Sequence, residues 1–206
     1  MRSRTHTVWL RYLQHKGISE KDFTIKNVET EQIPAAFEVG GIDGAIAWDP
    51  YATLIIEKGL GRPVLTPKEI AEPLKVTYPF FVMTTEETIK KKPELVQKFV
   101  TAWAKTLDYV HKNKGEVAEI MQAFFAREGT KLSKETVKKL LDGTNYDHAK
   151  VTMADIDDTM ESAKIQFEQK KLKKLPDLKQ HVDNSFAEKA EKAMKATKRT
   201  AAKKTE

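Results

Sequence analysis

Hydrophobic and polar positions follow two different spacings in the first 83 residues and one helical spacing afterwards. In the first part, stretches with helical apolar spacing alternate with short apolar and β-branched runs, which predicts helices and strands in alternation. The predicted order is a helix over 5–16, a strand over 23–29, a helix from Thr30 to the Gly40-Gly41 pair, a strand over 42–48, a helix opening at Asp49 and Pro50, and a strand over 63–66. This order is typical of a parallel α/β sheet.

The run "VTYPFFVM", residues 76–83, ends the alternation and is predicted to be a fourth strand, with Pro79 at an edge or a bend. Beyond it the apolar residues keep a helical period. This predicts a helix over 93–113, a second over 117–125, a third capped by Ser133 and a fourth over 152–170. The predicted organisation is an α/β unit over 1–78, the end of this strand with the C-terminal helices over 79–187, and a tail over 188–206.

Charge changes this picture only at the end of the chain. The net charge is +6, but the 36 basic residues are interleaved with 30 acidic ones, which is the pattern of solvated helix faces rather than of a nucleic-acid site. The last stretch, "KAMKATKRTAAKKTE", is basic and rich in alanine and threonine, without an apolar period. It predicts a disordered tail, and no nucleic-acid partner is expected.

The side chains that would support catalysis or metal binding are missing or scattered. The chain has no cysteine, and its five histidines lie at no ligand spacing, so no metal, cofactor or enzymatic activity is expected. Asp155, Asp157 and Asp158 lie at a predicted helix start, where their expected role is to complement the helix dipole. No apolar run is long enough to span a membrane, and "MRSRTHTVWL" lacks the apolar core of a signal peptide, so this chain is expected to carry no export signal.

Two stretches remain as candidate ligand sites. In "RTHT", residues 4–7, the start of the first helix offers unpaired backbone N–H groups, and the side chains of Thr5, His6 and Thr7 add hydrogen-bond donors for an anion. Ordinary helix capping by a threonine explains the same residues equally well. In "AWDPYA", Trp48 and Asp49 follow a predicted strand at the sheet edge where ligands bind in open α/β sheets, although core closure and capping are also possible there.

Four segments, taken in order, carry a family resemblance. They are "THTVWLRYLQHKGIS", "IPAAFEVGGIDGAIAWDPYA", "YPFFVMTTEETIKKKPELVQKFVTAWAKTLDYVHKN" and "KKLPDLKQHVDNSF", and together they extend over residues 5–187. They resemble the substrate-binding proteins of ABC importers for nitrate, aliphatic sulfonates, taurine and related small solutes. The same group shares a domain with the thiamine-pyrimidine synthesis proteins of yeast.

The resemblance implies a two-lobed periplasmic-binding-protein fold of type II, which binds a small anionic solute in the cleft between its lobes and delivers it to an ABC permease. It implies a binding protein without a cofactor, located in the periplasm or outside the cell and membrane-anchored when full-length. Carried over by position, the implied ligand-binding residues are Thr5, His6, Thr7, Trp48, Asp49 and Tyr78, the last on the return strand.

The chain departs from the family pattern because it starts near the first element of the second lobe. It is therefore expected to be a C-terminal portion that lacks most of the first lobe, with an exposed apolar face that leads to self-association or low stability. Two alternatives stay open. One is a pyrimidine-synthesis protein, which the absence of cysteine disfavours. The other is a truncated helical binding module with a basic tail, whose affinity for nucleic acid or an acidic membrane would fall steeply with salt.

Overall fold

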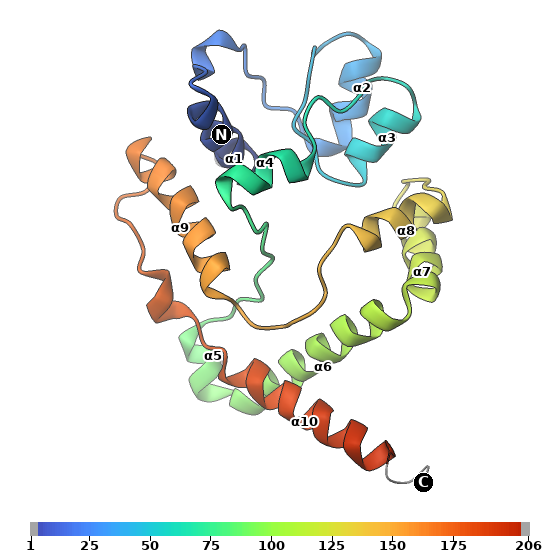
Figure 1. The fold of residues 1–206 in the computed structure, drawn as a ribbon, viewed down its shortest axis with the longest axis vertical. Coiled ribbons are helices and arrows are strands. Elements are labelled where there is room, and N and C mark those ends of the chain that lie inside the picture. The colour runs from blue at the N-terminus through green and yellow to red at the C-terminus, as the bar shows by residue number, and fades with distance from the viewer. Residues whose placement is uncertain (1–3, 203–206) are drawn as a thin grey trace. The chain divides into compact units, whose positions relative to one another are not determined.

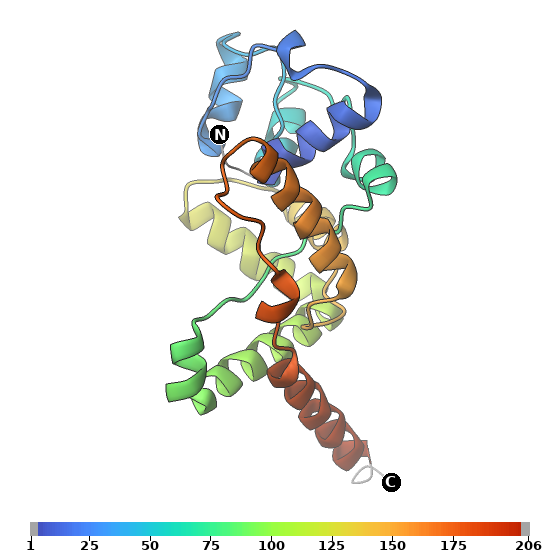
Figure 2. The same cartoon turned by 90° about the vertical axis from the view of Figure 1, so that its left-hand side faces the viewer.

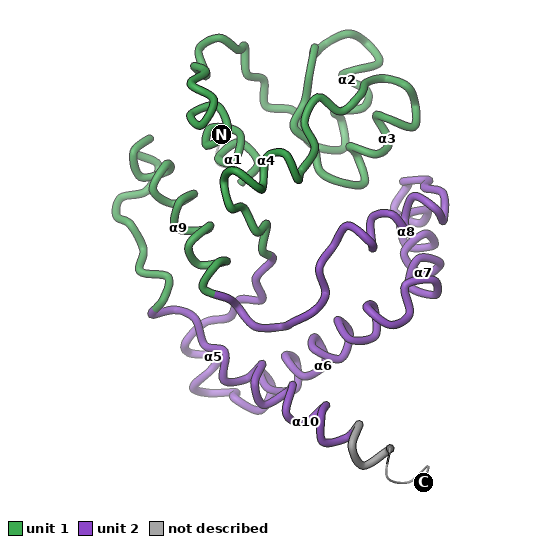
Figure 3. The backbone as a smooth tube through the Cα atoms, viewed as in Figure 1, with its two compact units in different colours: residues 1–79, 153–179 green, residues 80–152, 180–206 purple. Residues whose placement is uncertain are grey.

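A computed structural model describes residues 4–202 and their side chains as far as residue 197. The chain forms two compact units, each assembled from two stretches of sequence (Figure 3). Unit 1 consists of Met1–Pro79 and Met153–Lys179, and unit 2 of Phe80–Thr152 and Gln180–Glu206. Each unit is therefore completed by a segment that lies far away in the sequence.

Unit 1 is helical, and α1 packs against both α4 and α9, while α2 packs against α3 (Figures 1 and 2). Its elements are α1 (Arg4–Lys16), the 3-10 turns η1 (Glu20–Asp22) and η2 (Thr30–Gln32), α2 (Ile33–Glu38), α3 (Tyr51–Glu57), α4 (Pro67–Leu74) and α9 (Met153–Glu168). A further 3-10 turn, η3 (Leu178–His181), follows α9. The buried apolar side chains of this unit are Val8, Tyr12, Leu13, Ile33, Ile55, Val76, Ile156 and Ala163.

Helix α1 forms where its apolar period predicts it. Its inward face buries Leu13, which is 2% exposed, and Gly17, which follows the last helical residue, has a φ of +68° that glycine adopts readily. The N–H of Ile18 then donates to the carbonyl of Leu13 at 2.9 Å, which satisfies a carbonyl at the helix end. The predicted and observed ends of this helix agree at Lys16.

Helix α4 follows the segment predicted as a strand over 63–66, in a stretch for which the sequence predicted no element. Thr66 and Glu69 make a capping box, in which the N–H of Thr66 donates to Glu69 Oε2 at 2.7 Å and the N–H of Glu69 donates to Thr66 Oγ1 at 3.3 Å. The hydrogen bonds from Thr66 also lower the pKa of Glu69. Pro67 occupies the first helical position, where its missing N–H costs nothing and its fixed φ suits the helix.

Unit 2 contains α5 (Glu86–Lys91), α6 (Pro93–Lys112), α7 (Lys114–Arg127), α8 (Lys134–Asp142) and α10 (Ser185–Ala202). Helix α6 packs against α5, α7 and α10, and α7 packs against α8. The buried apolar side chains are Ala104, Val117, Ala118, Leu132, Val137, Leu141, Ala187 and Ala190. The helices predicted over 93–142 are present, with ends within a few residues of those predicted.

Replacing Ser133, the N-cap of α8, by Ala is expected to lower the free energy of unfolding by about 1 kcal/mol. The Ser133 hydroxyl accepts a hydrogen bond from the N–H of Thr136 at 3.0 Å, and alanine would leave that donor without its partner. Urea unfolding followed by circular dichroism measures the loss. Ser133→Thr keeps the capping hydroxyl and should stay close to the wild-type value; equal losses in both variants would show that the cap contributes nothing.

Helix α10 differs from the disordered tail predicted from residue 188. It spans Ser185–Ala202 and buries Ala187 and Ala190 against α6. The physical reason is that alanine is a strong helix former and is small enough to let two helices pack closely. The packed face of α10 is therefore made of alanines, which the search for an apolar period did not detect. The remaining part of the predicted tail, residues 203–206, lies outside the described residues.

The predicted strands do not form in the described residues. Over 4–202 the segments 23–29, 42–48, 63–66 and 76–83 contain neither helix nor strand, so this prediction is wrong here and the α/β character of the fold class is not confirmed. A strand is stable only when its backbone groups pair with a neighbouring strand, and composition alone cannot supply that neighbour. Phe80 and Met83, in the last of these segments, are 93% and 85% exposed instead.

Unit 2 exposes apolar side chains at helical spacing. Leu95, Phe99 and Trp103 follow one another along α6, and Ile120 and Phe124 follow one another along α7. All five are exposed beyond a third of their surface, and Phe99 reaches 57%. An apolar stripe of this kind is a common site of protein association.

The isolated chain is therefore expected to self-associate through α6. The double variant Leu95→Gln/Phe99→Gln should shift the sedimentation profile toward the monomer, because it removes apolar surface that association would bury. Lys98→Gln, an exposed change on the same helix, is the control and should leave the profile unchanged. A monodisperse wild-type monomer with a cooperative melt would contradict the expectation.

Candidate anion-binding site

One face of α1 gathers polar side chains in unit 1. Arg4, Thr7 and Arg11 lie three and four positions apart, which places them on the same side of the helix. Thr7 and Arg11 are buried, at 3% and 9% exposure, and Arg4 is half-buried. A helix face that buries an arginine needs a partner for the charge.

Asp158 of α9 is that partner. Its Oδ1 accepts a hydrogen bond from Arg11 Nη1 at 2.5 Å, and its Oδ2 accepts one from Arg4 Nη2. Oδ2 also accepts from the N–H of Thr77 at 3.0 Å and from the hydroxyl of Thr77 at 3.3 Å. Arg11 Nη2 donates to the carbonyl of Leu74 at 2.7 Å. We call Arg4, Arg11, Thr77 and Asp158 the Asp158 cluster; it ties the start of α1, the end of α4 and the middle of α9 together.

The Asp158 cluster carries a net charge of +1, because two guanidinium groups surround one carboxylate. Burial by itself raises the pKa of Asp158, but the hydrogen bonds from Arg11 and Thr77 and the charge of Arg4 outweigh it and lower the pKa. The carboxylate is therefore ionised at neutral pH. Arg4 Nε is buried and has no hydrogen-bond partner among the described residues. The cluster thus has one positive charge more than it neutralises internally.

Tyr78 follows Thr77 directly and has a strained backbone. Its φ of +48° is a genuine outlier for a bulky residue and costs on the order of 1–3 kcal/mol, a kind of strain that clusters at functional sites. Burial is the largest influence on the phenol and raises its pKa. The charges of Arg4 and Arg11 lower this pKa and that of Asp158 raises it, so that the pKa is raised overall. The phenol is thus a neutral hydrogen-bond donor at neutral pH, and it is 38% exposed.

The predicted helix-start donors are only partly available to a ligand. His6 Nε2 lies 2.6 Å from Glu20 Oε1, so this ring nitrogen is engaged within unit 1. Thr7 is buried, whereas Thr5 is half-buried. Of the predicted residues, Thr5, His6 and Thr7 lie on the same helical turn as Arg4, and Tyr78 is linked to the cluster through Thr77.

Trp48 and Asp49 lie elsewhere in unit 1, at the start of α3. Asp49 Oδ1 accepts hydrogen bonds from the N–H of Thr53 at 3.2 Å and from its hydroxyl at 2.6 Å, which is a capping role. Trp48 is 52% exposed. Over residues 4–202, no hydrogen bond or ion pair joins either side chain to the Asp158 cluster.

Sequence reasoning missed the central residue of the site. Asp158 was expected to complement a helix dipole, but the structure places it in the second turn of α9, fully buried against two arginines. The signal that could have revealed it is the pair Arg4 and Arg11, seven residues apart on a helix face that also carries apolar side chains. Such a face predicts a buried acidic partner but does not say where in the sequence it lies.

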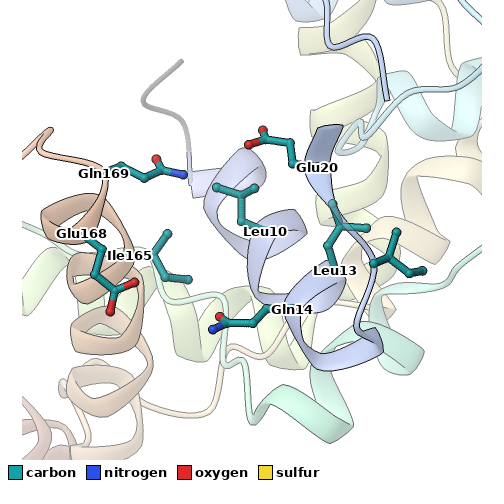
Figure 4. A pocket seen from close by; sticks show the side chains of 8 residues that line it. Leu10, Leu13, Gln14, Glu20, Ile165, Glu168 and Gln169 are labelled. Carbon is teal, nitrogen blue, oxygen red and sulfur yellow. The ribbon is translucent and has the colours of Figure 1, made fainter. Parts of the chain in front are cut away.

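An open groove of about 300 Å³ lies between α1 and α9 and is the alternative to the Asp158 cluster as an anion-binding site (Figure 4). Its lining includes the apolar side chains of Leu10, Leu13, Ile18 and Ile165 and the carboxylates of Glu20 and Glu168. These two carboxylates repel an anion, and none of the predicted site residues lines this groove. The Asp158 cluster therefore remains the better candidate for anion binding.

Metal and membrane sites receive no support from the described part of the chain. Residues 4–202 contain no group of three or more His, Cys, Asp or Glu side chains that could hold a metal ion. None of the described helices combines the length and the apolar content that crossing a membrane requires.

A half-buried guanidinium, a helix start and a neutral phenol are the groups with which proteins bind small anions. The NMT1-like family model matches residues 2–125, more than half of the chain, and the protein belongs to that family. The family resemblance drawn from the sequence is thereby confirmed.

A relative from Bacillus subtilis (strain 168), named "Putative aliphatic sulfonates-binding protein", is 26% identical over 169 residues. This alignment covers 82% of the chain and 48% of the relative, so the chain spans about half the length of the curated relative it matches. No solved structure matches the chain. Asp158 lies beyond the residues that the family model covers.

Proposed function

We propose that the protein is a solute-binding receptor for a small sulfonate-type anion and that unit 1 supplies part of its binding site. The observation that carries the proposal is the Asp158 cluster, whose unneutralised positive charge lies at the start of α1. The name of the Bacillus subtilis relative supports a sulfonate as the solute class. The family and the relative's name also favour a binding protein over an enzyme.

The proposed chemistry uses donors that act together. A sulfonate presents three oxygens that share one negative charge. Arg4 would donate to them through N–H groups that Asp158 does not use, and the first backbone N–H groups of α1 would add the positive end of the helix dipole. Thr5 and Tyr78 would supply hydroxyl donors.

The remaining predicted ligand residues enter the proposal in different roles. His6 and Thr7 would support the helix start, because His6 bonds to Glu20 and Thr7 is buried. Trp48 and Asp49 would line a wall of the site only in an arrangement of α3 that brings them toward α1. If the tests below locate the anion at the start of α1, Trp48 and Asp49 are the first residues to be removed from the proposed binding site.

The proposal extends to transport. In the complete receptor the solute would be enclosed in a cleft between two lobes of a type II fold and delivered to an ABC permease, in the periplasm or at the outer face of the cell membrane. Family membership supports this step. The helical fold of the described residues also fits the helical module with a basic tail. The name of the Bacillus subtilis relative favours the receptor over both that module and the pyrimidine-synthesis alternative.

Isothermal titration with ethanesulfonate tests the proposal, with dimethyl sulfone as an uncharged analogue of similar size. The wild type is expected to bind the sulfonate and not the sulfone. At about 100 times its Kd the sulfonate should also add roughly 2.7 kcal/mol to the free energy of unfolding. A wild-type chain that binds neither ethanesulfonate nor any other small anion would refute the proposal.

Arg4→Gln is expected to weaken ethanesulfonate binding about tenfold or more, because it removes a charge-assisted donor at the site. Lys68→Gln removes the same charge from α4, where the side chain is 80% exposed, and should bind like the wild type. Equal affinities in Arg4→Gln and Lys68→Gln would place the anion away from the start of α1.

A further inference from the structure

The charge of the Asp158 cluster depends on a single buried carboxylate. Arg4 and Arg11 each contribute +1, and Asp158, whose side chain has 0% exposure, contributes −1. Glu20 is the other carboxylate bonded to the first turns of α1, but it is held by His6 and its side chain is 39% exposed, so water and salt screen it. Asp158 is thus the only fully buried carboxylate among these groups.

We infer that Asp158 is a specificity-determining residue, which sets the charge of the anion site at +1 and makes it prefer singly charged over doubly charged anions. This inference rests on the proposed function. A sulfonate carries one negative charge and is neutralised by the cluster as it stands. Sulfate has a similar tetrahedral shape but carries two charges, and binding it would leave one negative charge uncompensated in a half-buried place.

The hydrogen bonds of the Asp158 cluster hold its carboxylate in place, so the net charge beside a bound anion stays the same. Both Asp158 oxygens are engaged, Oδ1 with Arg11 and Oδ2 with Arg4 and Thr77, so the carboxylate cannot rotate away from the arginines without losing buried hydrogen bonds. Arg11 is fixed in addition by the carbonyl of Leu74. Arg4 is the member with exposed surface, 33% of its side chain, and with a buried Nε that has no partner among the described residues. An anion would therefore meet the excess charge at Arg4.

The test compares ethanesulfonate with sulfate by titration calorimetry at constant ionic strength. Asp158→Asn raises the cluster charge to +2. One added charge attracts a dianion twice as strongly as a monoanion, so the affinity ratio of ethanesulfonate to sulfate is expected to fall about tenfold or more. Arg4→Gln lowers the cluster charge to zero and should shift the same ratio in the opposite direction, while both affinities weaken.

Two variants serve as matched controls. Asp157→Asn removes the same charge from the exposed side of α9 and should keep the wild-type ratio. The double variant Arg11→Gln/Asp158→Asn has the wild-type cluster charge and should return the ratio to within about twofold of wild type, because the charge and not the carboxylate sets the preference.

The outcomes separate this inference from the proposed function. If the wild type binds both anions and the ratio stays constant in folded Asp158→Asn and Arg4→Gln, the inference is overturned while the proposed function stands. If Asp158→Asn does not fold, the ratio in Arg4→Gln decides: an upward shift supports the inference and an unchanged ratio overturns it. A wild type that binds no anion refutes both.

Discussion

Replacing Asp158 by Ala is expected to lower the free energy of unfolding of unit 1 by about 3–5 kcal/mol, because it leaves the guanidinium groups of Arg4 and Arg11 without their shared counter-ion. The loss also removes the acceptor for the Thr77 N–H, so a backbone donor is left unsatisfied. Urea unfolding measures the change, with Trp9 of α1 as the fluorescent reporter.

Asp157→Ala is the matched control for this prediction. Asp157 precedes Asp158 on α9 but is exposed, so its removal should change the free energy of unfolding by no more than about 0.5 kcal/mol. Similar losses in the two variants would mean that the buried ion pairs do not stabilise unit 1 and that only the helix charge matters.

The pH dependence of stability gives a second, independent measure of the Asp158 cluster. The pKa of Asp158 is lowered below its ordinary value of 3.8, so near that pH the native state binds fewer protons than the unfolded state and stability rises with pH. The contribution of Asp158 is thus complete above that value and is lost as the pH falls through the lower folded pKa. The difference in unfolding free energy between wild type and Asp158→Asn should be constant from about pH 6 to 8 and shrink in acid; a constant difference down to about pH 2 would contradict the ionised pair.

Replacing Leu141 by Ala is expected to destabilise unit 2 by about 2–5 kcal/mol, because the side chain is 1% exposed and its removal leaves a cavity between packed helices. Leu95→Ala is the control, measured at a protein concentration at which the chain is monomeric: it makes the same chemical change in a helix of the same unit, at a position that is 56% exposed. It should cost less than about 1 kcal/mol, since little apolar surface returns to water. Trp103 reports on unit 2 in a background where Trp9 and Trp48 are replaced by Phe. A similar cost at both positions would indicate that α8 is not packed as observed.

The candidate site shows how far sequence reasoning reached. The first helical turn was predicted as an anion-binding position from its residue types, and the structure places an arginine cluster with excess positive charge there. The roles of Thr5, His6, Thr7, Trp48, Asp49 and Tyr78 stay predictions. Asp158 could not be assigned, because it is 147 positions away from Arg11, and no local pattern records which buried charge meets which.

The same distinction holds for the fold. Apolar periodicity determined most of the longer helices, because the inward face of a helix is written in residues three and four positions apart. The short apolar and β-branched runs were a poorer guide. They predicted strands over 23–29, 42–48, 63–66 and 76–83, which the described residues do not form. Strand formation needs a hydrogen-bonding neighbour, which local composition does not encode.

What the sequence determined by itself is therefore local: the positions of the long helices, the donor-rich start of α1, the lack of cysteine, and the order of segments that identifies the family. What only the tertiary structure decided is the burial of α10 alanines against α6 and the pairing of α9 with α1 through Asp158. The physical reason is that helix formation follows from neighbours in sequence, whereas the neutralisation of a buried charge depends on which distant segment packs against it.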